Sequence, residues 1–268
     1  MRVLHVSSQR PDRTGSGVTL DALVRHAGRA GWDQHVVCGI AADADHPEVG
    51  ELPADRVHPL RFGTDSVPFL LPGMSDVMPY PSTRFSDMDT TQVQAYRAAW
   101  TQHLESILAG FSPDLIHSHH VWLLGALLKD VAPEIPVVSH CHATGLRQMA
   151  TCPHLAPAVR AGCARNDRFV VLTRAHARAL VEQLGIDESR VHVVGAGFRD
   201  RLFHARGRTF EPSGSLAYVG KLAHAKGLPW LLDAVERIAK RRDITLHVAG
   251  AGGGEEGAAL AERIERMP

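Results

Sequence analysis

Short apolar runs rich in β-branched residues alternate with amphipathic stretches along most of the chain, and this alternation limits the possible folds more than any other feature. Strands and helices that alternate in this way are typical of a parallel sheet. The apolar runs contain few polar residues, so we expect their strands to be buried on both faces under packed helices. The expected strands are residues 2–7, 34–38, 56–60, 115–117, 137–140, 168–172 and 192–194, and the expected helices are residues 20–30, 91–110, 123–131 and 175–184.

These elements are expected to form two domains of the α/β class. Residues 1–198 are predicted to form one doubly wound, Rossmann-like domain, and residues 199–214, which contain glycine and proline, a linker. Two strands bury too little to be stable alone, so we expect residues 215–268 to pack on the first domain or to begin a second Rossmann-like domain that is incomplete at Pro268. Its expected strands are residues 216–219 and 244–249, and its expected helices are residues 226–240 and 255–267.

Composition excludes several classes of protein. An apolar content of 44% in 268 residues is too high for a disordered or fibrous chain, and 29 basic residues balance 29 acidic ones. No strong positive field exists to attract nucleic acid, and we expect at most peripheral contact with a membrane. The chain has neither a signal peptide nor a run of roughly 18 apolar residues, and its four cysteines are irregularly spaced. We therefore expect a cytoplasmic protein with reduced thiols, compatible with a homodimer.

A glycine cluster, Gly15-Ser16-Gly17, follows the first expected strand and opens the first expected helix. Backbone N–H groups and the helix dipole favour an anion at such a place, and glycine lets a phosphate approach the backbone closely. An ordinary strand-to-helix turn is the alternative, because short glycine patterns are common.

A second cluster, Gly220-Lys221 followed by Lys226-Gly227, comes after a buried strand and includes the start of an expected helix. Two ammonium groups that converge there would neutralise a departing diphosphate without a metal. Lysines in general lie on a solvated face, but their position beside glycine favours a binding site.

The order and spacing of several motifs resemble the glycosyltransferase family 4 type of GT-B enzyme along essentially the whole chain. The motifs are Arg2-Val3-Leu4-His5-Val6-Ser7, the Gly15–Gly17 cluster, Asp114-Leu115-Ile116-His117-Ser118-His119, Val138-Ser139-His140-Cys141-His142-Ala143-Thr144, and the two lysine–glycine pairs.

This resemblance implies a retaining, hexosyltransferase-like enzyme that moves a sugar from a nucleotide sugar to an acceptor hydroxyl. In that family the donor lies between two Rossmann-like domains, the first of which faces the acceptor. The resemblance implies that Gly220, Lys221 and Lys226 bind the donor diphosphate and that Gly15 to Gly17 approach it. Lys221 stands where the family more often has arginine, so the charge is kept but the bidentate contact is lost.

Histidines supply further candidates, although most of the 17 must be incidental. By resemblance, His142 contacts the donor sugar and phosphate, and we assign it a catalytic role with Lys221 and Lys226. His119 and His120 end the preceding expected strand at the same sheet edge, where open α/β sheets bind ligands. We expect those two histidines, together with Arg147 and Gln148, to bind the acceptor. Residues 65–89, a proline-rich loop, are expected to influence the choice of acceptor.

Zinc is an alternative use of some of these residues, because His140, His142, Cys152, His154 and Cys163 lie within 24 residues. We expect His140 and His142 to point to opposite faces of the sheet, and no tight Cys-x-x-Cys pair is present. We therefore predict no metal site, no cofactor, and a metal-independent reaction.

The family also carries a Glu-x7-Glu motif after its lysine signature, and no such pair in a strand–loop–helix setting is present here. Glu255 and Glu262 are seven residues apart, but they belong to the last amphipathic helix, where a solvated face is the simpler interpretation. The chain is therefore expected to bind a donor weakly and to turn it over slowly.

Other functions remain open. One is a non-catalytic GT-B-like module that binds a sugar or a partner, and another is an epimerase or phosphorylase that uses activated sugars. An NAD-dependent oxidoreductase is disfavoured, because residues 9–14 separate the first strand from Gly15 and Leu20 stands where a third glycine is needed.

Overall fold

A computed structural model of the chain describes residues 1–12, 14–207 and 214–267. The chain divides into two compact units, Met1–Phe198 and Arg199–Pro268. Most of the expected linker lies at the start of the second unit, and its residues 208–213 lie outside the described residues, as does Pro268.

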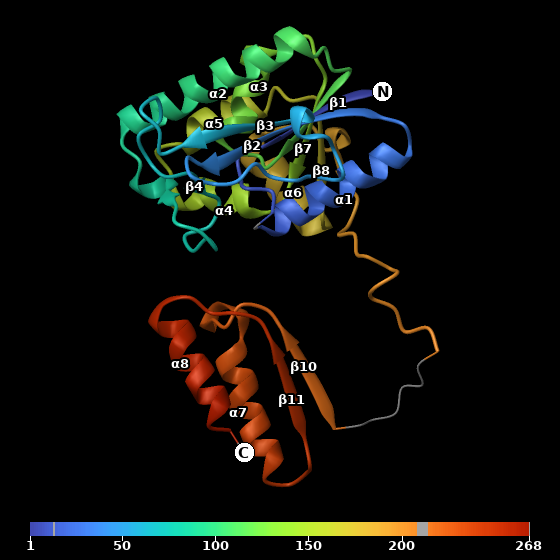
Figure 1. Ribbon diagram of the computed structural model, residues 1–268, viewed down its shortest axis with the longest axis vertical. Helices are drawn as coiled ribbons and strands as arrows, with labels where there is room; N and C mark the ends of the chain where they lie inside the picture. The colour runs from blue at the N-terminus through green and yellow to red at the C-terminus, as the bar shows by residue number, and fades with distance from the viewer. Residues whose placement is uncertain (13, 208–213, 268) are drawn as a thin grey trace. The chain divides into compact units, whose positions relative to one another are not determined.

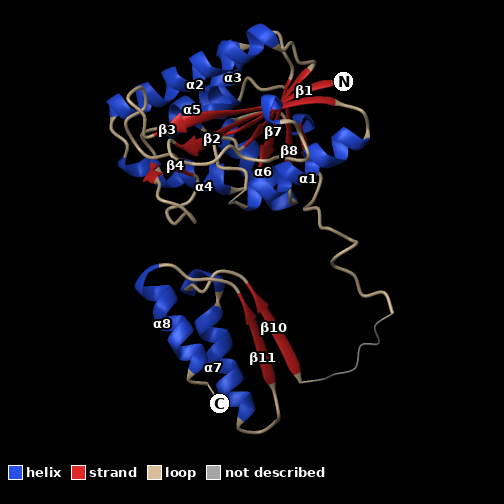
Figure 2. Ribbon diagram, viewed as in Figure 1, coloured by secondary structure: helices blue, strands red, loops and turns tan. Residues whose placement is uncertain are grey.

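The first unit is built on a seven-stranded sheet in the order β3-β2-β1-β6-β7-β8-β9, and all its neighbouring strands are parallel (Figures 1 and 2). The strand order reverses between β1 and β6, as in a Rossmann-like sheet. The expected α/β, Rossmann-like fold is therefore confirmed. The strands are β1 Arg2–Ser7, β2 Asp33–Ala41, β3 Val57–Phe62, β6 Leu115–His119, β7 Val137–Cys141, β8 Arg168–Val171 and β9 Val191–Val193.

Helices cover both faces of this sheet, and α1 lies on the opposite side from α2 and α3 (Figure 1). Leu20 and Val24 of α1 are fully buried in one cluster with β2, whereas Trp100 of α2 belongs to the larger cluster on the other face. Burial of such side chains stabilises the fold by about 1.5–3 kcal/mol each. The helices are α1 Gly15–Arg29, α2 Thr90–Gly110, α3 Leu123–Val131, α4 Thr144–Thr151, α5 Ala156–Cys163 and α6 Arg174–Leu184.

Two of these helices, α4 and α5, were not expected from the sequence. Each has eight residues, too few for a clear apolar period. Helix α1 begins at Gly15 and not at residue 20, because the Thr14 hydroxyl caps it by accepting a hydrogen bond of 3.0 Å from the Gly17 N–H.

The loop of residues 65–89 is largely fixed to the first unit. It contains the short strands β4 Pro72–Gly73 and β5 Thr83–Arg84, which pair with each other. Six of its side chains are buried in the main core, so the loop is anchored to the first unit. They are Val67, Phe69, Leu71, Met74, Phe85 and Met88.

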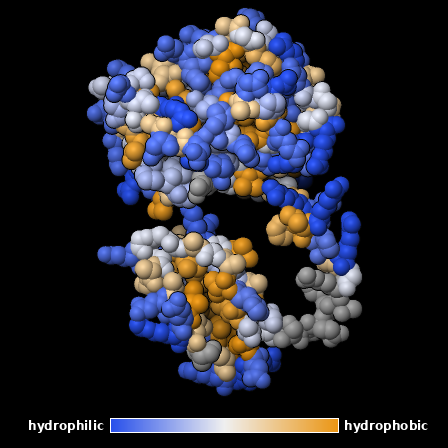
Figure 3. Space-filling model, viewed as in Figure 1, coloured by the Kyte–Doolittle hydropathy of each residue, from blue (hydrophilic) through white to orange (hydrophobic). Residues whose placement is uncertain are grey.

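The second unit contains two parallel strands, β10 Ser215–Val219 and β11 Thr245–Ala249, with the helices α7 Leu228–Ala239 and α8 Gly254–Glu265. Its small core consists of Leu222, Leu228, Leu232 and Leu260. Large apolar side chains remain exposed, and apolar surface is visible on this unit in Figure 3. They include Leu216, Val219, Trp230 and Ile238.

Among the described residues, no helix combines the length and the apolar character needed to cross a lipid bilayer.

Candidate functional site

The carboxyl edge of the large sheet gathers most of the expected site residues of the first unit. β1 and β6 are hydrogen-bonded neighbours at the point where the strand order reverses. Ligands of open α/β sheets bind in the crevice outside the strand ends at such a point. The α1 turn follows β1 here, His119 ends β6, and His142 follows β7 directly.

Three histidines expected at this edge lie together. The ring centroids of His119 and His142 are 5.5 Å apart, and those of His120 and His142 are 5.2 Å apart. Nδ1 of His119 lies 3.3 Å from Nε2 of His142, a hydrogen-bond distance. The strand ends thus place the two expected acceptor residues beside the expected sugar residue, and their roles remain predictions.

The expectation that His140 and His142 point to opposite faces is wrong. Residues two apart on a strand point to the same face, and the two rings stack with centroids 4.1 Å apart. The cysteines of the zinc alternative do not join them: among the described residues, the groups close enough to hold a metal contain only histidines. Cys152 and Cys163 are buried and contact Gln148 and the Trp122 carbonyl instead.

Burial keeps these histidines neutral near pH 7. It lowers the pKa of His142 to about 2 and the pKa of both His120 and His140 to about 4, and it holds the pKa of His119 well below its ordinary value. Neighbouring rings would repel a second charge and lower the pKa of His142 further. A neutral ring can donate one hydrogen bond and accept another, but it brings no positive charge to a phosphate.

Two residues beside these rings have left-handed backbone conformations that are rare outside glycine. They are His120, with φ of 88°, and Ala143, with φ of 68°. His120 directly follows β6, and its N–H donates a 3.0 Å hydrogen bond to the His140 carbonyl. Such conformations cost about 1–3 kcal/mol and cluster at functional sites. Ala143 directly follows His142, and the His120 ring lies 5.2 Å from the His142 ring, so both unusual conformations lie at the candidate site.

The glycine cluster forms the first turn of α1. Gly17 is buried, and a Cβ at this position would lie 1.8 Å from the Pro11 carbonyl oxygen, so only glycine fits. Gly15 has no atom within 4 Å of its would-be Cβ and faces open space. Gly17 is thus required by packing, whereas Gly15 leaves room for a ligand to approach.

Gln9 is a residue of this edge that the sequence analysis missed. It is fully buried, and its amide joins the segment after β1 to the 65–89 loop. Its Nε2 donates to the Pro72 carbonyl at 3.0 Å, and its Oε1 accepts from Tyr80 at 3.3 Å. Its place two residues after β1, at the ligand-binding edge, could have identified it.

Arg147 and Gln148 occupy different environments although they are adjacent in α4. Arg147 is exposed, and its guanidinium lies 3.4 Å from the Ser75 hydroxyl and 3.9 Å from Asp76 in the 65–89 loop. Gln148 is only 2% exposed, and its Oε1 accepts from the Cys152 thiol at 3.2 Å. Because this side chain is buried and bonded to Cys152, we do not retain Gln148 as an acceptor residue.

The lysine signature lies in the second unit, after the carboxyl end of β10. Lys221 and Lys226 are exposed, and Lys226 ends a 3-10 turn, His224–Lys226. The left-handed Gly227, with φ of 77°, then begins α7 at Leu228, two residues later than expected. Lys226 therefore precedes the helix N-terminus instead of lying in its first turn.

The turns after β10 and β11 are held close together. Glu256 of α8 accepts hydrogen bonds from the His224 N–H at 2.5 Å and from its Nδ1 at 2.8 Å. A Cβ at Gly250 would lie 1.8 Å from the Gly220 carbonyl oxygen, which explains a glycine there. These contacts fix the backbone of the turn that carries Lys221 and Lys226. The sequence analysis missed that Glu256 stabilises this turn through His224.

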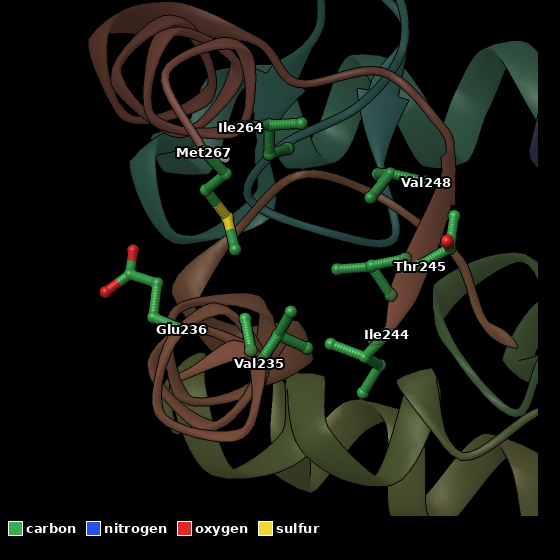
Figure 4. Close-up of a pocket in the computed structure, with 9 residues that line it drawn as sticks. Val235, Glu236, Ile244, Thr245, Val248, Ile264 and Met267 are labelled. Atoms are coloured by element: carbon green, nitrogen blue, oxygen red, sulfur yellow. The ribbon is translucent and has the colours of Figure 1, made fainter. Parts of the chain in front are cut away.

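A hollow in the second unit, lined by both apolar and polar atoms, lies apart from these lysines. Figure 4 shows it between α7, β11 and the end of α8, with side chains such as Val235, Ile244 and Met267 around it. It opens beside the amino end of β11, whereas the lysines follow the carboxyl end of β10. The hollow is therefore separate from the candidate site.

Comparisons with solved structures identify the fold. Sucrose-phosphate synthase from Thermosynechococcus elongatus is similar with a TM-score of 0.66 and 15% identity, over 99% of this chain and 66% of that one. The catalytic domain of starch synthase IV from Arabidopsis thaliana, bound to ADP and acarbose, gives 0.64 and 13%, over 99% and 71%. UDP-GlcNAc 2-epimerase from Neisseria meningitidis, bound to UDP-GlcNAc, gives 0.54 and 14%, over 100% and 69%. The fold is that of the GT-B glycosyltransferases.

The family follows from the sequence of the first unit. Residues 14–197 match the glycosyl transferase 4-like domain, which is more than half of the chain. The chain belongs to this glycosyltransferase family. No curated protein matches it, and it spans 66% of the length of the sucrose-phosphate synthase.

Proposed function

We propose that this chain transfers a sugar, with retention of configuration, from a nucleotide-diphosphate sugar to an acceptor hydroxyl. The observation that carries the proposal is the sheet edge of a glycosyl transferase 4-like domain, where the α1 glycine turn follows β1 and a neutral His142 follows β7. The starch synthase and epimerase neighbours are described with bound ADP and UDP-GlcNAc. These ligands support a nucleoside diphosphate as the leaving group here.

Lys221 and Lys226 are proposed to bind the diphosphate and to stabilise the negative charge that develops as it leaves. Both are exposed and follow a strand end, so a phosphate can reach them. Ammonium groups supply this stabilisation without a metal ion. Gly220, which donates its N–H to the Ala249 carbonyl at 3.0 Å, holds the turn in place.

His142 is proposed to orient the donor sugar. Because its ring is neutral, it contributes hydrogen bonds and position instead of charge. The helix dipole behind Gly15 and Gly17 would favour the anionic donor. Arg147 is proposed to contact the acceptor, with the 65–89 loop limiting its size. His119 and His120 are only 2% and 4% exposed, so they are proposed to position His142 instead of binding the acceptor themselves.

Donor binding by the 268-residue chain is proposed to be weak. Within the described residues, the two glutamates seven apart lie in one helix, and Glu262 forms an ion pair with Arg266. In the described part of the chain, Glu255 and Glu262 therefore do not form a carboxylate pair that could hold the hydroxyls of the ribose and the sugar. We expect turnover that is slow but dependent on the lysines.

The function is tested by a screen for nucleotide release across UDP-, ADP- and GDP-sugars, at high protein concentration, with and without candidate acceptors. We expect one donor class to release nucleoside diphosphate faster when an acceptor is present. Donor converted to its epimer without an acceptor would favour the epimerase alternative, and donor binding with no reaction would favour the non-catalytic module. Either outcome would contradict the proposed transfer.

A further inference from the structure

Four strand histidines of the first unit, together with His142 just after β7, share one face of the sheet, which is unusual for a core. In the strand register, His5 of β1 is paired with His117 of β6, and His119 of β6 is paired with His140 of β7. Paired residues of parallel strands point to the same side, and residues two apart do so as well. His142, two residues after His140, continues the row. Histidine rings from the neighbouring strands β1, β6 and β7, and from His142 just after β7, therefore lie on one side of the sheet at its carboxyl edge.

The nitrogens of His119, His140 and His142 converge. One ring nitrogen of each lies within 4.8 Å of those of the other two. The 3.3 Å between Nδ1 of His119 and Nε2 of His142 is notable, because zinc–nitrogen bonds of about 2.0–2.1 Å at tetrahedral angles place two ligand atoms about 3.3 Å apart. One edge of a tetrahedral site therefore already has the required length, and the nearest nitrogen of the third ring lies within 4.8 Å of both atoms.

The third ring is also the one without hydrogen-bond partners. His140 is 5% exposed, and both of its nitrogens are buried without a partner, as is Nε2 of His119. Leaving a buried polar atom unpaired costs about 1–3 kcal/mol, so such atoms call for a ligand. In the neighbouring group of His5, His117 and His119, by contrast, the His5 nitrogens already contact Gln34 at 3.1 Å and His117 at 3.2 Å.

We propose that His119, His140 and His142 form a site for a divalent transition-metal ion, with Zn²⁺ as its natural occupant. Three neutral imidazoles suit zinc, cobalt, nickel or copper, whereas calcium and magnesium require oxygen ligands. His142 is half-buried, so an ion can enter from its side.

Metal binding and sugar contact would compete for His142, so the ion is not a requirement of the proposed transfer. The site can therefore be tested without any donor.

The test is titration of the metal-free 268-residue chain with Co²⁺, followed by visible absorption, and displacement of the Co²⁺ by Zn²⁺. We expect one equivalent to bind with the intense absorption of a four-coordinate site, and X-ray absorption of the zinc form to show three imidazoles. His140→Ala and His142→Ala should each weaken binding by more than about tenfold. His154→Ala is the matched control, because His154 is exposed and belongs to no metal group.

Folding of each variant is checked by circular dichroism, and Zn²⁺ should raise the melting temperature of the wild type and of His154→Ala only. His142→Ala, at the half-buried end of the row, gives an answer if His140→Ala fails to fold. Weak binding of several equivalents with six-coordinate absorption, or wild-type affinity in a folded His142→Ala, would overturn the proposal.

Discussion

Replacing Lys226 by alanine is expected to reduce the release of nucleoside diphosphate from a nucleotide-sugar donor at least about a hundredfold. A single group that stabilises charge in the transition state is typically worth about 10²–10³ in rate. Lys226 is exposed at the end of its 3-10 turn, so its removal should change stability by less than about 0.5 kcal/mol. The loss of rate would then report on the reaction and not on folding.

The measurement is single-turnover release from a labelled donor, which is sensitive enough for a slow enzyme. Lys240→Ala is the matched control, because Lys240 is an exposed lysine at the other end of α7. Lys226→Arg keeps the charge and should retain part of the rate. Equal rates for Lys226→Ala and Lys240→Ala would remove the diphosphate role from Lys226.

The first unit is expected to lose most of its stability as the pH falls from 6.5 to 4. Four histidines that are at most 5% exposed carry the effect: His5, His119, His120 and His140. Burial lowers the pKa of His5, His120 and His140 to about 4 and that of His119 well below its ordinary value. The unfolded chain, with ordinary histidine pKa values near 6.5, therefore binds protons that the folded chain cannot.

The sign follows from proton linkage. Stability is complete above pH 6.5 and falls as the pH drops toward the folded-state pKa values, by up to about 1.4 kcal/mol per pH unit for each group. Domains are typically stable by only about 5–15 kcal/mol, so four such groups can remove most of the stability of this unit as the pH approaches 4. Carboxylates with lowered pKa values, such as Asp167, titrate below this range.

Urea unfolding followed by circular dichroism at pH 7.5, 6.5, 5.5 and 5.0 measures this dependence. His140→Asn should reduce the number of protons taken up on unfolding by about one, so the free energy of unfolding should depend less steeply on pH. The same change at the exposed His154 should leave this dependence unchanged. A free energy of unfolding that stays constant from pH 7.5 to 5.0 would show that these rings are not buried as described.

Strands β1, β2, β6 and β7 could be predicted because they are largely buried and therefore read as apolar runs. The helices α4 and α5 could not, since eight residues give too little periodicity. The start of α4 at the left-handed Ala143 is also invisible in sequence, because that residue type rarely adopts such a backbone. The start of α1 was predicted too late because it depends on a local cap. The Thr14 side chain caps the helix and so adds a first turn that contains two glycines.

The candidate site was partly predictable for a similar reason. His119, His120 and His142 follow strand ends, and a parallel sheet brings strand ends together. Gln148 could not be separated from Arg147 by sequence, because only packing shows which of two adjacent helical side chains faces inward. The row of histidines across β1, β6 and β7 required the register of three strands, which no local pattern supplies.

Proton NMR of the transfer reaction, with an α-linked donor and the acceptor that the screen selects, tests the proposed glycosyl transfer most directly. It follows the anomeric proton of the product and the nucleoside diphosphate at the same time, and EDTA is included because the lysines are proposed to replace a metal in the reaction. We predict that an α-glycoside and the nucleoside diphosphate appear at equal rates. A β-linked product, or a donor that stays intact with every acceptor, would contradict it.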